Sequence, residues 1–157
     1  MGRTRNEHGR AGKLRRQAVK EDVQAVIFRR AGGLEFLLIE RYDRPSGQFH
    51  WRLVKGTVRP GEGAEEALLR EIKEEVGLSN VQVLAELGSY VFREPSGIQH
   101  YVRSFLVEAD PSEPVRLAPS DDGRVLRGYR WARAEEAIRL LRWPSEREML
   151  KKALGAL

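Results

Sequence analysis

The sequence contains no cysteine, which excludes a disulfide framework and thiolate metal sites. It has no apolar run that approaches the roughly 20 residues of a membrane-spanning helix, so we expect no membrane attachment. The first residues are basic, but no apolar segment follows them as it would in a secretory signal. These absences are typical of a protein from a reducing compartment, and we predict a cytoplasmic location.

Aromatic residues are few, at 8%, whereas charged residues reach 32% and hydrophobic residues 41%. This composition is typical of a globular protein, and 157 residues suffice for one domain with a sizeable core. Neither internal repeats nor low-complexity blocks interrupt the chain. We therefore predict one folded domain over residues 19–157.

The positive charge is confined to the N-terminal segment. Residues 1–20 hold seven Lys or Arg and one acidic residue, Glu7, a net charge of +6. Because the whole chain carries +5, the remaining residues sum to −1, and net charge gives no support for nucleic-acid binding by the domain itself. Residues 1–18 are poor in apolar residues, so we predict a disordered basic tail, with an RNA- or phosphate-binding arm as the alternative.

Hydrophobic periodicity predicts a mixed α/β fold. Residues 35–41 should form a central strand covered on both faces, because the run at 36–39 is entirely apolar. The Gly32-Gly33 pair predicts a hairpin turn before it. The other expected strands cover residues 23–28, 50–54, 81–86, 89–93, 98–109 and 126–131, and the first of them follows a change of pattern at residue 19. The expected helices cover residues 64–76, 133–142 and 146–154, with Ser145 as N-cap of the last.

The segment from Gly56 to Leu78 carries the strongest functional signal. It begins as a glycine-rich loop and continues as a helix in which Glu71, Glu74 and Glu75 fall on one face. Like charges at this spacing repel each other, and a bound divalent cation would reverse that repulsion. Three glutamates alone are more typical of a solvated surface helix, with Arg70 in ordinary i,i+4 ion pairs.

The full spacing of this segment favours a metal site. It reads Gly-x5-Glu-x7-Arg-Glu-apolar-x-Glu-Glu-x-Gly-apolar, from Gly56 through Glu62 and Arg70 to Leu78. In this pattern the sequence resembles the Nudix hydrolases, whose signature box matches at all nine positions. The resemblance covers about residues 19–142 and implies an α/β/α sandwich. In that fold the box helix covers one face of a mixed sheet and the C-terminal helices cover the other.

The resemblance also implies a chemistry. Nudix enzymes hydrolyse pyrophosphate linkages with Mg²⁺, for which Mn²⁺ can substitute, and the cation neutralises phosphate charge and activates a water. By resemblance, the metal ligands are Glu71, Glu74, Glu75 and the carbonyl of Gly56. Glu71 and Glu74 also count as catalytic, because one box carboxylate often serves as general base, and the sequence leaves open which. Glu62 and Arg70 are expected to support them.

Substrate contacts are expected from cationic and aromatic residues around the box. Lys55 directly precedes Gly56 and is a candidate phosphate ligand, as are Arg52 and Arg44. Tyr101 and Arg103 share a strand face and are predicted to bind a base and a phosphate, although a strand aromatic equally suits a core. Residues 51–56 resemble the Trp-x-Leu-Pro-Lys-Gly entry of the diadenosine polyphosphate hydrolases, with a valine in place of the proline.

Many Nudix enzymes place a further acid in the loop before the last strand. The nearest acids here are Asp121 and Asp122, because arginine, valine and leucine occupy the positions directly before that strand. Either the loop is shifted or the box glutamates suffice.

Our hypothesis is a pyrophosphohydrolase for dinucleoside polyphosphates. ADP-ribose, nucleotide sugars, modified nucleoside triphosphates and triphosphorylated RNA ends stay open as substrates, because specificity lies in loops outside the box. A nucleotide-sensing module without turnover is the alternative of another class, and the complete set of glutamates argues against it. The sequence is compatible with a monomer or a homodimer.

Overall fold

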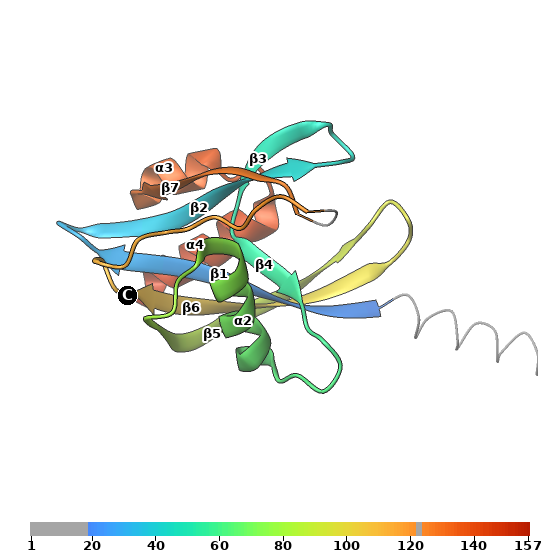
Figure 1. Cartoon of the computed structure of the whole chain (residues 1–157), viewed down its shortest axis with the longest axis horizontal. Coiled ribbons are helices and arrows are strands. Elements are labelled where there is room, and N and C mark those ends of the chain that lie inside the picture. The colour runs from blue at the N-terminus through green and yellow to red at the C-terminus, as the bar shows by residue number, and fades with distance from the viewer. Residues whose placement is uncertain (1–18, 122–123) are drawn as a thin grey trace, which may run out of the picture.

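The computed structural model describes residues 19–121 and 124–157 (Figure 1). The basic tail predicted for residues 1–18 lies outside the described residues, and so does Asp122. None of the described helices has the length and apolar character needed to cross a membrane.

The described residues form a sheet of seven strands with the order β3-β2-β1-β6-β5, while β4 pairs with β1 and β7 with β2. The strands are β1 (Val19–Arg30), β2 (Leu34–Asp43), β3 (Gln48–Arg52), β4 (Val54–Thr57), β5 (Val81–Arg93), β6 (Gln99–Ala109) and β7 (Leu126–Ala132). β1 runs parallel to β6 and antiparallel to β2 and β4, so the sheet is mixed, as predicted. The expected hairpin turn joins β1 to β2, with positive φ at Gly32 and Gly33.

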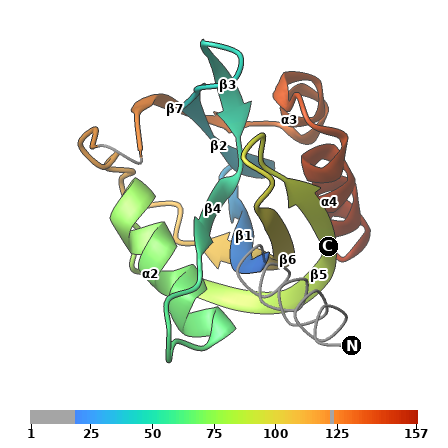
Figure 2. The ribbon, with the colours of Figure 1, turned by 90° about the vertical axis from the view of Figure 1, so that its right-hand side faces the viewer.

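Helices cover both faces of this sheet. Helix α2 (Ala64–Val76) lies on one face, and α3 (Ala134–Leu140) with α4 (Pro144–Gly155) on the other (Figure 2). The predicted α/β/α arrangement is confirmed, with the box helix alone on its face.

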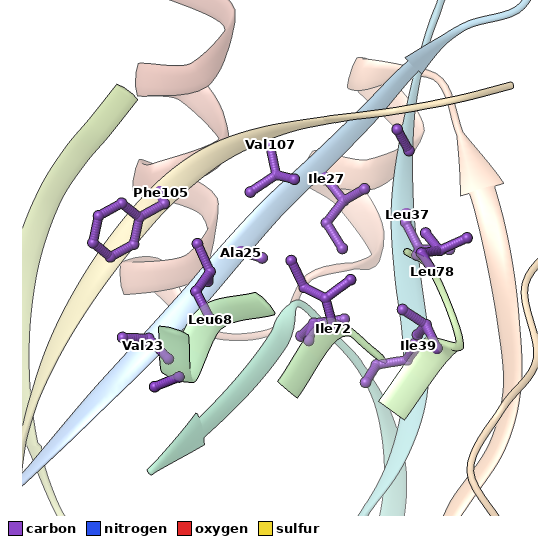
Figure 3. Close-up of a cluster of buried hydrophobic side chains, with 14 of the residues drawn as sticks. Val23, Ala25, Ile27, Leu37, Ile39, Leu68, Ile72, Leu78, Phe105 and Val107 are labelled. Atoms are coloured by element: carbon purple, nitrogen blue, oxygen red, sulfur yellow. The ribbon is translucent and has the colours of Figure 1, made fainter. Parts of the chain in front are cut away.

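The strands at the centre bury both of their faces. On β2, Leu37 and Ile39 face α2 and pack with Leu68 and Ile72 of that helix (Figure 3). Leu38, one residue out of phase, belongs to a second buried cluster beneath α3 and α4. The apolar run was therefore a correct sign of a doubly covered strand.

Helix α2 has the predicted bounds. Its apolar stripe packs on the sheet, and Gly77 ends it with φ 72°, donating its N–H to the Lys73 carbonyl at 3.1 Å. Leu78 follows directly and is buried, as expected of the contact after a left-handed cap. The α2 backbone is thus anchored at its C-terminal end.

Three local predictions were wrong. The strand expected at 50–54 is divided at Leu53 into β3 and β4, which pair with different neighbours. The two pieces expected at 81–86 and 89–93 form a single strand, β5, with register shifts that bend it along β6. Ser145 does not cap α4, because the helix already begins at Pro144, where the missing N–H costs nothing.

Candidate active site

Gly56 brings the loop before α2 against the helix. It lies on β4, paired with Val23 of the central strand. A Cβ on Gly56 would collide with the Cγ, Cδ and Oε1 atoms of Glu71. Glycine is therefore required because the Glu71 side chain occupies the space of a side chain on residue 56.

Arg70 ties the loop to the helix. Its guanidinium donates to both oxygens of Glu62, from Nε at 2.6 Å and from Nη2 at 2.9 Å, and to the Thr57 carbonyl at 3.0 Å. It also donates from Nη1 to Glu71 at 2.7 Å and to Glu74 at 3.3 Å. Hydrogen bonds from Arg70 lower the pKa of Glu62 to about 2, with a further contribution from the backbone N–H of Arg59. The supporting role predicted for Glu62 and Arg70 has this geometric basis.

Glu75 is the most deeply buried of the three box glutamates. Its side chain is 0% exposed, and neither carboxylate oxygen has a partner with full hydrogen-bond geometry. Burial raises the pKa of the Glu75 carboxyl to about 7, although the guanidinium groups of Arg41 and Arg124 oppose the shift. The nearby backbone N–H of Lys55 also helps to lower this pKa. Arg41 Nη1 lies 3.5 Å from Glu75 Oε2.

Arg124 reaches the same carboxylates from the segment before β7, which lies beside α2 (Figure 2). Its Nη2 atom lies 3.9 Å from Glu71 Oε2 and 3.6 Å from Glu74 Oε2, and its Nε atom lies 3.8 Å from Glu75 Oε2. Asp121 lies beside it and exchanges two backbone hydrogen bonds with it, of 2.8 and 3.2 Å. The loop in which we sought an acid therefore places an arginine among the glutamates.

These residues line an open cleft of about 470 Å³. Its cationic and anionic lining residues are Arg41, Lys55, Arg59, Arg70, Glu71, Glu74, Asp121 and Arg124. Over residues 19–121 and 124–157, no three acidic or histidine side chains are arranged so that they could hold a metal ion as they stand. Instead, Glu71 and Glu74 each contact both Arg70 and Arg124.

A second cavity of about 420 Å³ adjoins the cleft at Lys55, which lines both. Aromatic side chains of Tyr90, Phe92 and Trp143 form much of its wall. The Nζ atom of Lys55 lies 4.0 Å from the centroid of the Phe92 ring. Burial, followed by the charge of Arg52, lowers the pKa of Lys55 to about 8. Lys55 therefore joins the cleft that contains the box glutamates to an aromatic cavity.

The comparison with protein families agrees with this geometry. A family model described as NUDIX domain matches residues 20–153 of the chain. This protein belongs to the Nudix hydrolase family. The predicted family and its enzymatic nature are confirmed.

Curated relatives and a solved structure add detail. The chain is 29% identical over 130 residues to the asymmetrical bis(5'-nucleosyl)-tetraphosphatase of Caenorhabditis elegans, covering 81% of this chain and 88% of that protein. It is 38% identical to the RNA pyrophosphohydrolase of Nitratiruptor sp. over 58 residues, covering 37% of this chain and 36% of that protein. The fold resembles a C. elegans Ap4A hydrolase binary complex with a TM-score of 0.75 at 23% identity, covering 87% of this chain and 96% of the other.

The Nudix cleft does not contain every predicted substrate residue. Arg52 lines the aromatic cavity, where its guanidinium stacks 4.0 Å from the Trp143 ring centroid. Arg44 is exposed in the turn after β2, between two residues that line the same cavity. Tyr101 and Arg103 line neither the cleft nor the aromatic cavity, and Arg103 instead pairs with Glu86 at 2.7 Å. Their shared strand face was predicted correctly, but neither cavity supports the substrate contacts expected of them.

Glu146 of the Nudix domain was missed by the sequence reasoning. Its buried carboxylate, on α4, accepts the Leu53 N–H at 2.7 Å and the Arg52 Nε–H at 2.5 Å. These bonds stabilise the chain at Leu53, where β3 ends and β4 begins. They therefore position Lys55, which lies on β4. No local pattern could reveal this, because Glu146 is 93 residues away from Leu53 and reads as an ordinary helix-surface acid.

His100 packs against Phe92, one of the aromatic side chains that line the second cavity. Its ring nitrogens lie 2.7 Å from Asp22 Oδ2 and 2.7 Å from Glu94 Oε2, and its ring stacks on Phe92 at 4.5 Å. Asp22 also accepts the Thr57 hydroxyl at 3.0 Å. This network links the aromatic cavity to the strand that carries Gly56.

Proposed function

We propose that this Nudix enzyme hydrolyses a pyrophosphate linkage of dinucleoside polyphosphates, with a divalent cation at the glutamates of α2. The observation that carries the proposal is the place of Lys55, which lines both the cleft that contains the glutamates and the aromatic cavity. A polyphosphate chain crossing Lys55 would put a nucleoside into the aromatic cavity and the scissile linkage beside the glutamates. Stacking on Tyr90, Phe92 or Trp143 suits a base.

The donor atoms of the glutamate site suit a hard divalent cation, although the described side chains are not grouped around one as they stand. The buried oxygens of Glu75 have no partner with full hydrogen-bond geometry, only guanidinium groups at 3.5 and 3.8 Å, and a bound cation would satisfy them. Oxygen-only ligands suit Mg²⁺, or Mn²⁺ in its place. Glu71, Glu74, Glu75 and the carbonyl of Gly56 would hold it. When bound, the cation would neutralise phosphate charge and lower the pKa of a coordinated water.

The chain's own residues would orient this chemistry. Arg70 donates to Glu71 and Glu74 while Glu62 and Thr57 fix its other nitrogens, so both carboxylates are held before substrate arrives. Lys55 would bind a phosphate oxygen of the substrate beside them. Its pKa of about 8 leaves it mostly charged near pH 7.

A triphosphorylated RNA end is the second candidate substrate. The similarity to an RNA pyrophosphohydrolase favours it, but that similarity spans about a third of either chain. The tetraphosphatase similarity extends over most of both chains. ADP-ribose and nucleotide sugars have only two phosphates, so they offer fewer phosphate oxygens to Lys55 and to the arginines of the cleft.

The test is a side-by-side assay with Mg²⁺ on diadenosine tetraphosphate, ADP-ribose and a triphosphorylated RNA oligonucleotide. We expect the dinucleoside tetraphosphate to have the highest kcat/KM. In Lys55→Met, the difference in kcat/KM between diadenosine tetraphosphate and ADP-ribose should shrink by the equivalent of about 1–3 kcal/mol. This is the value of a hydrogen bond to a charged group. Lys73→Met is the matched control, because Lys73 pairs with Ser79 and lines neither cavity. A tenfold preference for ADP-ribose would refute the substrate assignment.

A further inference from the structure

In the described part of the chain, the buried side-chain atoms without a hydrogen-bond partner are concentrated at one point. Among the side chains that the structure describes, the buried nitrogen and oxygen atoms without a hydrogen-bond partner are Glu75 Oε1, Glu75 Oε2 and Arg124 Nε. Native proteins leave few such atoms, and each one calls for a physical explanation. Here the unpaired donor and the unpaired acceptors belong to neighbouring groups of opposite charge, 3.8 Å apart.

We propose that Arg124 is an exchangeable counter-ion of the box glutamates, which competes with the divalent cation and then binds substrate phosphate. This inference rests on the proposed function in one respect, that the glutamates bind a divalent cation. It assigns a role to Arg124, which lies in the loop where the resemblance to Nudix enzymes predicted a further acid. Arg124 thereby couples metal binding to phosphate binding within one cleft.

The geometry of the contacts shows why Arg124 can exchange. Its guanidinium approaches the three glutamates at 3.6 to 3.9 Å, beyond hydrogen-bonding distance. The attraction is therefore coulombic, spread over three carboxylates, without a directional bond to break. An 18% exposed side chain also has a route toward solvent.

Arg70 provides the contrast. It contacts Glu71 and Glu74 as well, but with hydrogen bonds of 2.7 and 3.3 Å. Two further hydrogen bonds hold it on Glu62, and one on the Thr57 carbonyl. Releasing Arg70 would sacrifice all of them, whereas the Nε atom of Arg124 has no hydrogen bond to lose and its contacts with the glutamates are 3.6 to 3.9 Å long. Of these two arginines, Arg124 is the one that a cation would displace.

The backbone keeps a released Arg124 at the cleft. Residue 124 is joined to Asp121 by two backbone hydrogen bonds, and the following Val125 carbonyl accepts the Tyr42 N–H at 3.0 Å. The side chain can therefore leave the carboxylates without leaving the cleft that it lines with Lys55 and Arg59. A guanidinium in that position suits a phosphate oxygen, which it can bind with two parallel N–H groups.

The two roles give one substitution two effects of opposite sign. Arg124→Gln removes the competing charge, so Mn²⁺ should bind the protein about tenfold more tightly in the absence of substrate. It also removes a phosphate ligand, so KM for a polyphosphate substrate at saturating Mn²⁺ should rise about tenfold. If Arg124 only supported the fold, its substitution would weaken both Mn²⁺ binding and substrate binding.

The experiment measures Mn²⁺ binding to the full chain by the electron paramagnetic resonance signal of the free ion. Arg127→Gln is the matched control, because it removes the same charge from the same region while its partner is Glu40, at 2.7 Å. We expect its Kd for Mn²⁺ to equal that of the wild type. Thermal unfolding in EDTA should show a lower Tm for Arg124→Gln, and saturating Mn²⁺ should abolish that difference.

The outcomes separate this inference from the proposed function. An unchanged or higher Kd for Mn²⁺ in Arg124→Gln would overturn the counter-ion role and leave the metal site and substrate intact. A tighter Kd without hydrolysis of any dinucleoside polyphosphate would support the counter-ion role and refute the substrate. If neither wild type nor variant bound Mn²⁺, both proposals would fall.

Discussion

Gly56→Ala should disrupt the site more than a single methyl group normally does. The new Cβ would lie well under 3.0 Å from three side-chain atoms of Glu71, so Glu71 must move. That movement would break its 2.7 Å hydrogen bond from Arg70, because Arg70 is held on Glu62 by two others. The Arg70–Glu71 hydrogen bond would be lost because the loop at Gly56 is in close contact with helix α2.

The magnitude follows from the bonds involved. Losing a hydrogen bond between charged groups that are largely shielded from solvent costs about 2 kcal/mol. For a domain of this size, each kcal/mol lowers Tm by about 2–4 °C, so we expect a decrease of about 6 °C. Displacing a metal-binding carboxylate should lower kcat/KM by about 10²-fold or more.

The assay pairs thermal unfolding with steady-state hydrolysis at matched Mg²⁺. Gly155→Ala serves as the control, because a Cβ there meets open space and alanine suits a helix end as well as glycine. It should retain wild-type Tm within about 2 °C and full turnover. Wild-type Tm together with wild-type turnover in Gly56→Ala would refute the reasoning, since Glu71 could then not be packed as described.

Three further predictions concern the surrounding charges. Glu74→Gln should lower turnover by about 10²-fold while leaving the circular dichroism spectrum unchanged; wild-type turnover would remove Glu74 from the metal site. The wild-type KM for a polyphosphate should rise as pH passes about 8, because the lowered pKa of Lys55 removes its charge there. In Lys55→Arg that rise should disappear, and an identical profile would argue against a phosphate contact. Glu146→Gln should cost about 2 kcal/mol in denaturant unfolding, because its buried carboxylate accepts two hydrogen bonds, and an unchanged midpoint would contradict that account.

The sequence determined the elements whose signals are local. The box helix occupies its predicted residues, because helical periodicity and a C-terminal glycine both act within a few turns. The doubly buried strand β2 was equally readable, since an apolar run without alternation has no solvent face. The family followed from fixed spacing within a single loop and helix, which a sequence displays directly.

The tertiary structure decided which distant side chains meet. Sheet register puts Arg103 beside Glu86 and away from the cleft, although its strand was predicted correctly. The path of the chain before β7 places Arg124 against the glutamates, and α4 delivers Glu146 to the break between β3 and β4. Such contacts depend on strand order and on the packing of helices across the sheet. They join residues far apart in the chain, so no spacing within the sequence encodes them.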